Sequence, residues 1–175
     1  MHTYIVLLRG INVAGKRKLS MVDLRELVCN LGFMNVITYI QSGNLILQTK
    51  KSKTITNTII KKGILNTFGY DVSVISRTVL ELEQAVNNYP FSTENEKIVG
   101  FVFLEKKPEI LELKINNLEQ EVFKIDKDVV YLYCVNGFGK SKMTNNLFEK
   151  KLKVNATTRN LKTTVKLIEL AKQYQ

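Results

Sequence analysis

The order of strand-like and helix-like segments over the first 76 residues constrains the fold more than any other feature. Strand-type segments, which are apolar throughout or alternate in polarity, occupy residues 3–9, 35–49 and 70–76. The middle segment is interrupted at Ser42-Gly43 and predicts two strands about a short turn. Apolar residues at helical spacing mark the two intervening segments, at 20–31 and 54–68. The order strand-helix-strand-strand-helix-strand predicts a ferredoxin-like α+β unit.

The second half of the chain follows a similar order. Its predicted elements are a strand at 98–105, a short helix at 109–115, strands at 121–126 and 129–134, a helix at 145–152, and a last helix at 159–173 with Thr158 as its N-cap. The polar segment 89–96, which contains one of the two prolines, predicts a connection. The sequence therefore predicts two ferredoxin-like subdomains with antiparallel or mixed sheets and helices packed on one face. The first, residues 1–88, also includes a linker helix at 78–88 with Thr78 as its N-cap, and the second spans residues 97–175.

The composition is that of an ordinary globular protein, with 45% hydrophobic and 24% charged residues. The N-terminal segment has no signal-peptide pattern, and no apolar run approaches the ~20 residues that a membrane helix needs. Cys29 and Cys134 both lie in apolar segments, which predicts free, buried thiols in a reducing compartment. We therefore expect a cytoplasmic protein without a membrane segment.

The formal net charge is +10, and the isoelectric point is about 9.6. Such an excess of positive charge favours contact with nucleic acid, other polyanions or phosphorylated ligands. A sequence rich in Lys, Asn and Ile can also reflect the base composition of a genome, in which case the lysines are merely solvated. Because the lysines are scattered along the chain, the sequence leaves both interpretations open.

The segment between Gly10 and Arg17 reads G-x-x-x-x-G-K-R, one residue away from the phosphate-binding loop of nucleotide hydrolases. In that loop a Ser or Thr hydroxyl binds magnesium, and here Arg17 takes its place. The following helix begins only at Ser20, and a ferredoxin-like unit lacks the parallel sheet in which such loops occur. These differences argue against a nucleotide hydrolase of this type.

The same segment has a second copy, because residues 5–20 align without a gap with residues 129–144. The identical pairs among asparagine, glycine and lysine are Asn12 and Asn136, Gly15 and Gly139, Lys16 and Lys140, and Lys18 and Lys142. Both copies lie between an apolar strand and a helix whose predicted N-cap is Ser20 or Thr144. The match predicts that the two halves are related by internal duplication.

Each copy has two interpretations. In a plain strand-to-helix connection, Gly15 and Gly139 supply positive φ, Asn12 and Asn136 bond their own turns, and the lysines are solvated. In an anion-binding site, two lysines beside free backbone N–H groups and a helix N-terminus form a nest. If the halves are related by a pseudo-twofold axis, the four loop lysines surround one ligand, to which Arg9 adds a bidentate contact.

Two further segments carry polar side chains suited to ligand contact. In Q-S-G-N, Gln41 and Asn44 offer amides to base edges or a polar substrate, although such a segment is commonly only a hairpin turn. In T-T-R-N, Arg159 lies at the predicted start of the last helix, where a cation is unfavourable unless a negative charge compensates it. Arg159 is therefore either a ligand contact or half of an ordinary salt bridge.

The sequence contains no recognisable catalytic or metal-binding pattern. His2 is the only histidine and lies at the terminus, and the two cysteines are far apart. Neither a histidine-based triad nor a zinc site is therefore expected. No pair of carboxylates indicates acid–base chemistry. We predict no metal and no cofactor, and assign no reaction.

Several motifs resemble those of a widespread bacterial family of uncharacterised proteins, catalogued as domain of unknown function 1697. They are R-G-I-N-V-x-G-K, Y-I-Q-S-G-N, G-K-S-K-[ML]-T and T-T-R-N, and they span nearly the whole chain. The resemblance implies an α+β fold of two similar subdomains and supplies no activity. The motif positions are Arg9, Asn12, Lys16, Gln41, Ser42, Asn44, Lys140, Arg159 and Asn160, without assigned roles. Leu161 stands where the family motif has an aromatic residue.

Three functions remain open at this point. The first is a protein that binds nucleic acid or another polyanion through the paired basic loops. The second is an enzyme or sensor for a small phosphorylated or carboxylated metabolite, held by Arg9, the four loop lysines and Arg159. The third is a protein-interaction module in which the loops are plain turns. The oligomeric state does not follow from the sequence.

Overall fold

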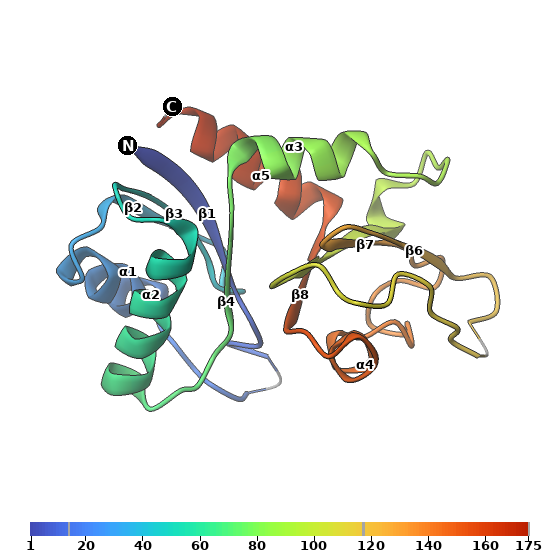
Figure 1. Cartoon of the computed structure of the whole chain (residues 1–175), viewed down its shortest axis with the longest axis horizontal. Coiled ribbons are helices and arrows are strands. Elements are labelled where there is room, and N and C mark those ends of the chain that lie inside the picture. The colour runs from blue at the N-terminus through green and yellow to red at the C-terminus, as the bar shows by residue number, and fades with distance from the viewer. Residues whose placement is uncertain (14, 117, 175) are drawn as a thin grey trace. The chain divides into compact units, whose positions relative to one another are not determined.

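The computed structural model describes residues 1–13, 15–116 and 118–174 (Figure 1). The chain divides into two compact units. Unit 1 comprises Met1–Leu82 and Lys166–Gln175, and unit 2 comprises Glu83–Val165. Each unit contains one four-stranded sheet. Helices α3 (Val79–Asn87) and α5 (Leu161–Lys172) both begin in one unit and end in the other.

Unit 1 contains strands and helices in the predicted order. They are β1 (His2–Leu8), α1 (Met21–Asn30), β2 (Met34–Tyr39), β3 (Asn44–Thr49), α2 (Lys53–Phe68) and β4 (Val74–Arg77). The strand order across the sheet is β2-β3-β1-β4, and all neighbouring strands are antiparallel. This arrangement is ferredoxin-like and confirms the fold predicted for the N-terminal half.

The helix boundaries follow capping chemistry that the sequence predicts. The Ser20 hydroxyl accepts hydrogen bonds from two backbone N–H groups in the first turn of α1, which confirms Ser20 as the N-cap. Gly69 ends α2 in the left-handed conformation, at φ 72°. At α3, the Thr78 N–H donates to the Glu81 carboxylate and the Glu81 N–H donates to the Thr78 hydroxyl.

None of the described helices is long and apolar enough to cross a bilayer.

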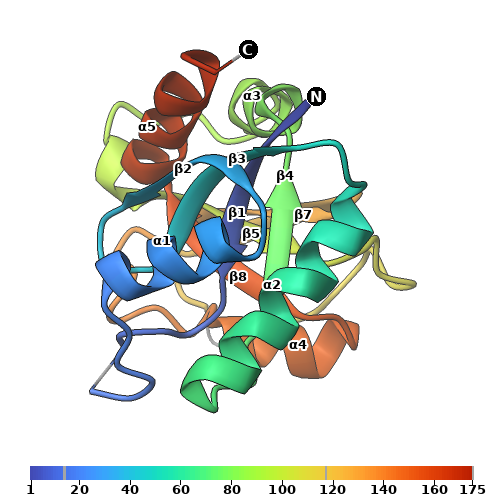
Figure 2. The same cartoon turned by 90° about the vertical axis from the view of Figure 1, so that its left-hand side faces the viewer.

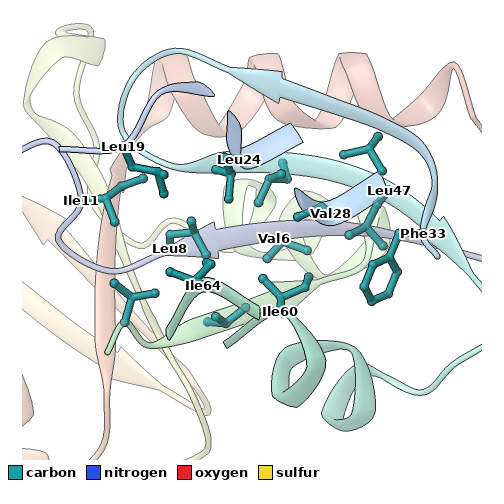
Figure 3. Close-up of a cluster of buried hydrophobic side chains, with 14 of the residues drawn as sticks. Val6, Leu8, Ile11, Leu19, Leu24, Val28, Phe33, Leu47, Ile60 and Ile64 are labelled. Atoms are coloured by element: carbon teal, nitrogen blue, oxygen red, sulfur yellow. The ribbon is translucent and has the colours of Figure 1, made fainter. Parts of the chain in front are cut away.

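The core of unit 1 lies between its sheet and the helices α1 and α2, which cross the same face of the sheet (Figure 2). Alternate residues of β1, Val6 and Leu8, supply the centre of the sheet side (Figure 3). The fully buried helical residues that pack against them are Leu24, Val28, Ile60 and Ile64. Because burial of one such side chain contributes about 1.5–3 kcal/mol, this face fixes how both helices lie on the sheet.

Unit 2 repeats the strand order of unit 1. Its elements are a short 3₁₀ helix (Glu96–Ile98), β5 (Val99–Leu104), β6 (Val122–Asp126), β7 (Val129–Tyr133), α4 (Asn145–Leu152) and β8 (Ala156–Asn160). The order across the sheet is β6-β7-β5-β8, again with antiparallel neighbours throughout. The α+β class with two ferredoxin-like halves is therefore confirmed.

The helix predicted at 109–115 is wrong. None of the described residues between β5 and β6 is helical. Leu113 and Ile115 are partly buried against the core of unit 2, whereas Glu112 and Lys114 are exposed. Apolar residues at every second position have the period of an extended chain. In chain order this segment lies between the first and second strands of unit 2, as α1 does in unit 1.

The start predicted for the last helix is also wrong. Residues Ala156–Asn160 form β8, which pairs with β5, and α5 begins only at Leu161. The N-cap is Asn160, whose side-chain oxygen accepts a hydrogen bond from the Thr163 N–H at 2.9 Å. Thr158, the predicted cap, bonds a side chain of α4 from within the strand. Because threonine is favoured both at caps and in strands, only the pairing with β5 decides between them.

The two thiols differ in exposure. Cys29 is exposed, which contradicts the prediction that it is buried. It directly follows buried Val28 on α1, so it points away from the core. Cys134 is buried as predicted, and this burial raises the pKa of its thiol to about 11.

Candidate functional site

The loop that joins β1 to α1, residues 9–19, folds back on itself and is termed the first basic loop. The Asn12 N–H donates to the Arg17 carbonyl at 3.2 Å, which closes the reversal. Asn12, Gly15 and Arg17 have positive φ values of 53°, 73° and 46°. The positive φ predicted for Gly15 is confirmed, and glycine adopts this conformation without steric cost.

Asn12 holds the first basic loop against the turn between β2 and β3. Its side-chain NH₂ group donates to the Leu19 carbonyl at 2.8 Å and to the Gln41 carbonyl at 2.9 Å. Its side-chain oxygen accepts a hydrogen bond from the Leu19 N–H at 2.8 Å. Both donors and the oxygen of this amide are therefore engaged within the fold, and Asn12 positions the loop.

The first basic loop presents three consecutive cations to solvent. Lys16, Arg17 and Lys18 are all exposed. No carboxylate among the described residues forms an ion pair with them, whereas Lys61 of α2 pairs with Asp71 at 2.9 Å. Adjacent like charges without acidic partners raise the local positive potential, which attracts anions.

The structure brings seven predicted site residues to one end of the unit 1 sheet. They are Arg9, Asn12, Lys16, Lys18, Gln41, Ser42 and Asn44. A third connection, between α2 and β4, joins this end as well. The half-buried Arg9 donates its backbone N–H to the Ser73 carbonyl at 3.0 Å, and the Tyr70 hydroxyl donates to the Lys18 carbonyl at 3.2 Å. The first basic loop is thus attached at both of its ends.

The turn between β2 and β3, residues 40–43, is strained where it faces solvent. Ile40 has a φ of 49° and is 47% exposed. This left-handed conformation is a rare outlier for a β-branched residue and costs about 1–3 kcal/mol. The buried Asn44 amide holds the turn by donating to the Tyr39 carbonyl at 2.9 Å and to the Ser42 hydroxyl at 3.0 Å. The fold therefore keeps Ile40 exposed in an unfavourable conformation.

Gly43 allows this turn to approach the first basic loop closely. Its φ is 74°, and its carbonyl accepts a hydrogen bond from the Leu8 N–H at 2.8 Å. A Cβ at this position would lie 2.7 Å from Ile11 Cδ1 and 2.8 Å from Leu8 Cβ. Because these separations are shorter than real Cβ contacts, the turn and the loop pack as one unit only with glycine here.

The second copy of the motif, in residues 135–143 (the second basic loop), does not repeat this geometry. Gly137 has the positive φ, at 80°, which contradicts the prediction for Gly139. Asn136 is exposed, and its side chain forms no hydrogen bond to a described residue, so the predicted bond to its own turn is also wrong. The exposed lysines of this loop are Lys140 and Lys142. The two copies thus share their lysines, but the second loop lacks the hydrogen bonds by which Asn12 holds the first loop in place.

The two basic loops occupy different positions in their ferredoxin-like units. The first loop follows β1, the first strand of its unit, and the second loop follows β7, the third strand of its unit. First and third strands are antiparallel neighbours in both sheets, so the loops lie at opposite ends of their respective sheets. The aligned segments are therefore the connection after the first strand of unit 1 and the connection after the third strand of unit 2. That the loops share one ligand stays a prediction.

Arg159 lies in β8, which contradicts its predicted position at the start of a helix. It is 7% exposed and donates to the Thr157 hydroxyl and to the Thr158 carbonyl, each at 2.8 Å. Burial lowers the pKa of its guanidinium to about 10, so Arg159 is still protonated at neutral pH. Arg77, on the fourth strand of unit 1, is likewise buried, at 3% exposure. No pattern in the sequence indicates this pair of buried arginines.

The positive charge of the chain is concentrated in unit 1. This unit contains 13 Lys and Arg residues against 5 Asp and Glu, a net charge of +8, whereas unit 2 contains 13 against 11, a net charge of +2. Beside the second basic loop, the buried Glu121 carboxylate accepts a hydrogen bond from the Ser141 hydroxyl at 2.9 Å. The electrostatic attraction for anions is therefore stronger at the first basic loop than at the second.

A family model described as "Protein of unknown function (DUF1697)" matches residues 1–131. The chain belongs to this family. Among solved structures, the conserved bacterial protein SP0830 from Streptococcus pneumoniae is similar over 97% of this chain and 98% of its own, with a TM-score of 0.73 and 24% sequence identity. At this level of identity the similarity establishes a common fold. No curated protein matches the chain.

In this DUF1697 protein the family motifs supply both residues that hold a loop or turn in place through hydrogen bonds and residues whose side chains are exposed. In the R-G-I-N-V-x-G-K motif, Asn12 holds the loop through hydrogen bonds and Lys16 is exposed. In the Q-S-G-N motif, Asn44 holds the turn through hydrogen bonds and Gln41 is exposed. The T-T-R-N motif contributes a buried strand residue, Arg159. Membership alone therefore does not distinguish the residues that shape the loops from those that face solvent.

Two exposed residues at this end of unit 1 were not predicted as site residues. Arg17 replaces the magnesium-binding hydroxyl of the phosphate-loop motif, and its position within K-R-K indicates a cationic cluster. The sequence predicts Ile40 as part of a strand, because an apolar residue directly before a polar turn gives no sign that its φ is positive.

Proposed function

We propose that the protein binds nucleic acid through the first basic loop of unit 1. The observation that supports this most strongly is the group of three exposed cations, Lys16, Arg17 and Lys18, without acidic partners among the described residues. Nucleic acids carry a regular row of phosphates, and each phosphate that a cation neutralises releases condensed counterions. The bonds from Asn12 fix the loop in place, which reduces the entropy lost when it binds.

An extended polyanion suits this loop better than a small metabolite does. Sites for small molecules are concave and surround most of the ligand surface. The three cations of the first basic loop are exposed instead, and each can form a separate contact with a phosphate. Polyanion binding accumulates affinity from several such exposed contacts, because the released counterions add up. The net charge of +8 on unit 1 also accelerates the encounter.

The proposal predicts that a fluorescein-labelled, mixed-sequence DNA single strand of about 20 nucleotides binds the full chain with a strong dependence on salt. For single strands, log K falls by about 0.7 per log unit of salt for each phosphate neutralised, so three contacts give a slope of about −2. Anisotropy titrations between about 50 and 200 mM salt measure this slope.

Two results would count against this proposal. Absence of binding at the lowest salt concentration would contradict nucleic-acid binding altogether. If the strand does not bind but inorganic phosphate or a nucleoside triphosphate raises the melting temperature, the ligand is a small phosphorylated molecule and not a nucleic acid.

The double variant Lys140→Gln, Lys142→Gln is expected to weaken strand binding less than loss of the first-loop cations, because unit 2 carries a net charge of only +2.

A further inference from the structure

The turn beside the first basic loop presents two side chains that the fold does not use. Ile40 is 47% exposed although isoleucine is usually buried, and its φ of 49° is unfavourable. Gln41 is exposed, and its side-chain amide forms no hydrogen bond with any described residue. An apolar side chain and a free amide with two donors and an acceptor therefore stand next to each other at the surface.

Three contacts hold this turn firmly in its strained conformation. Asn12 of the first basic loop donates to the Gln41 carbonyl at 2.9 Å. The Asn44 amide donates to the Tyr39 carbonyl and to the Ser42 hydroxyl. Gly43 packs against Ile11 and Leu8. Because the same amide of Asn12 also bonds Leu19, the turn and the cation-bearing loop keep a fixed relation to each other. The cations and the turn therefore form one rigid surface.

We infer that the turn at 40–43 contacts the bases of a single-stranded nucleic acid whose phosphates bind the first basic loop. This inference rests on the function proposed above and names its preferred substrate. Ile40 provides apolar surface for the face of an unstacked base, and the Gln41 amide pairs with a base edge. Base faces are stacked and inaccessible in a duplex, so the contact with Ile40 adds affinity only for a single strand.

The preference for single strands separates this inference from simple charge attraction. A site that recognises phosphates alone favours duplex DNA, because the duplex has the higher charge density and releases more counterions per contact. A site that also contacts bases favours the single strand. It also discriminates against an abasic oligonucleotide of equal length, which carries the same phosphates but no bases.

The test compares three labelled probes of equal length at constant salt: a mixed-sequence single strand, its duplex and an abasic strand. The variants are Ile40→Asn, which introduces a residue that tolerates positive φ, and Gln41→Ala, which leaves the backbone bonds of the turn in place. We expect each variant to weaken single-strand binding, Ile40→Asn by about tenfold because it removes exposed apolar surface that a bound base would bury. Binding of the abasic strand is expected to stay unchanged.

The matched control is Ile55→Asn, which removes an equally exposed isoleucine, 51% exposed, from α2. It is expected to leave binding of all three probes unchanged. If the wild-type chain binds the duplex or the abasic strand as tightly as the single strand, the inference is wrong while the proposed function stands. The same holds if Ile40→Asn and Gln41→Ala both leave single-strand binding unaltered. If no probe binds, the proposed function itself fails.

Discussion

Gly43→Ala is expected to lower the free energy of unfolding by about 2–5 kcal/mol. One part of this loss is the left-handed conformation, at φ 74°, which costs an L-residue about 1–2 kcal/mol. The rest arises because the new methyl group would lie 2.7 Å from Ile11 Cδ1 and 2.8 Å from Leu8 Cβ. Overpacking of this kind costs about 1–3 kcal/mol. Urea unfolding of the purified variant measures the total.

The matched control for this prediction is Gly69→Ala at the end of α2. Gly69 has nearly the same φ, 72°, but apart from its own and its chain neighbours' atoms no described atom lies within 4 Å of the position that its Cβ would take. It is therefore expected to lose only the conformational part, about 1–2 kcal/mol. Equal losses in the two variants would show that the close approach of the turn to the first basic loop contributes nothing to stability.

Replacement of Lys16, Arg17 and Lys18 by glutamine is expected to weaken single-strand binding about 100-fold near 0.1 M salt. Each lost phosphate contact removes about 0.7 from the negative slope of log K against log salt, so the slope should become shallower by about 2. The fold should be unaffected, because these side chains are exposed and form no ion pair with a described residue. Anisotropy and urea unfolding, measured on the same preparation, test both statements.

Net charge alone is controlled by replacing Lys106, Lys107 and Lys150 by glutamine. These three lysines are exposed, lie in unit 2, and change the net charge by the same amount when replaced. These lysines are not part of the proposed contact surface, and salt screens their general attraction for the strand, so this variant should lose less than about threefold in affinity. A similar loss in both triple variants would assign binding to overall charge and contradict a dedicated loop.

The fold was largely predictable because its elements have clear local signals. Apolar periodicity located β1, α1 and α2, and the hydroxyl of Ser20 marked the start of α1. The errors fall where local signals conflict. Residues Ala156–Asn160 contain two threonines that suit a helix cap or a strand equally well, and only pairing with β5 makes them a strand. Such long-range pairing leaves no mark in the segment itself.

The candidate site was predicted in its composition but not in its roles. The sequence suggests Asn44 as a ligand contact and leaves Asn12 either a bond to its own turn or part of an anion site. In the structure both side chains hold a loop or turn in place, through hydrogen bonds to backbone groups. Amide side chains suit either role, and the choice depends on which backbone groups the fold brings near them. The positive φ of Ile40 has no local sequence signal either, because it is imposed by contacts on both sides of the turn.

The two copies of the basic motif differ for the same physical reason. Their lysines align in sequence, but Asn12 finds the Gln41 carbonyl within reach whereas Asn136 bonds no described residue. The difference follows from topology, because the first loop lies beside the β2–β3 turn of its unit and the second loop lies at the opposite end of its sheet. Similar residues at similar spacing therefore acquire different roles.

The most direct test of the central claim is a ¹H–¹⁵N correlation spectrum of the full chain, titrated with an unlabelled single strand of about ten nucleotides at low salt. If the first basic loop and its neighbouring turn bind the strand, the largest shifts will occur at the backbone amides of residues 9–19 and 40–43. Amides of the second basic loop, residues 135–143, will shift less. Shifts confined to unit 2, or no shifts at saturating strand concentration, would contradict the account.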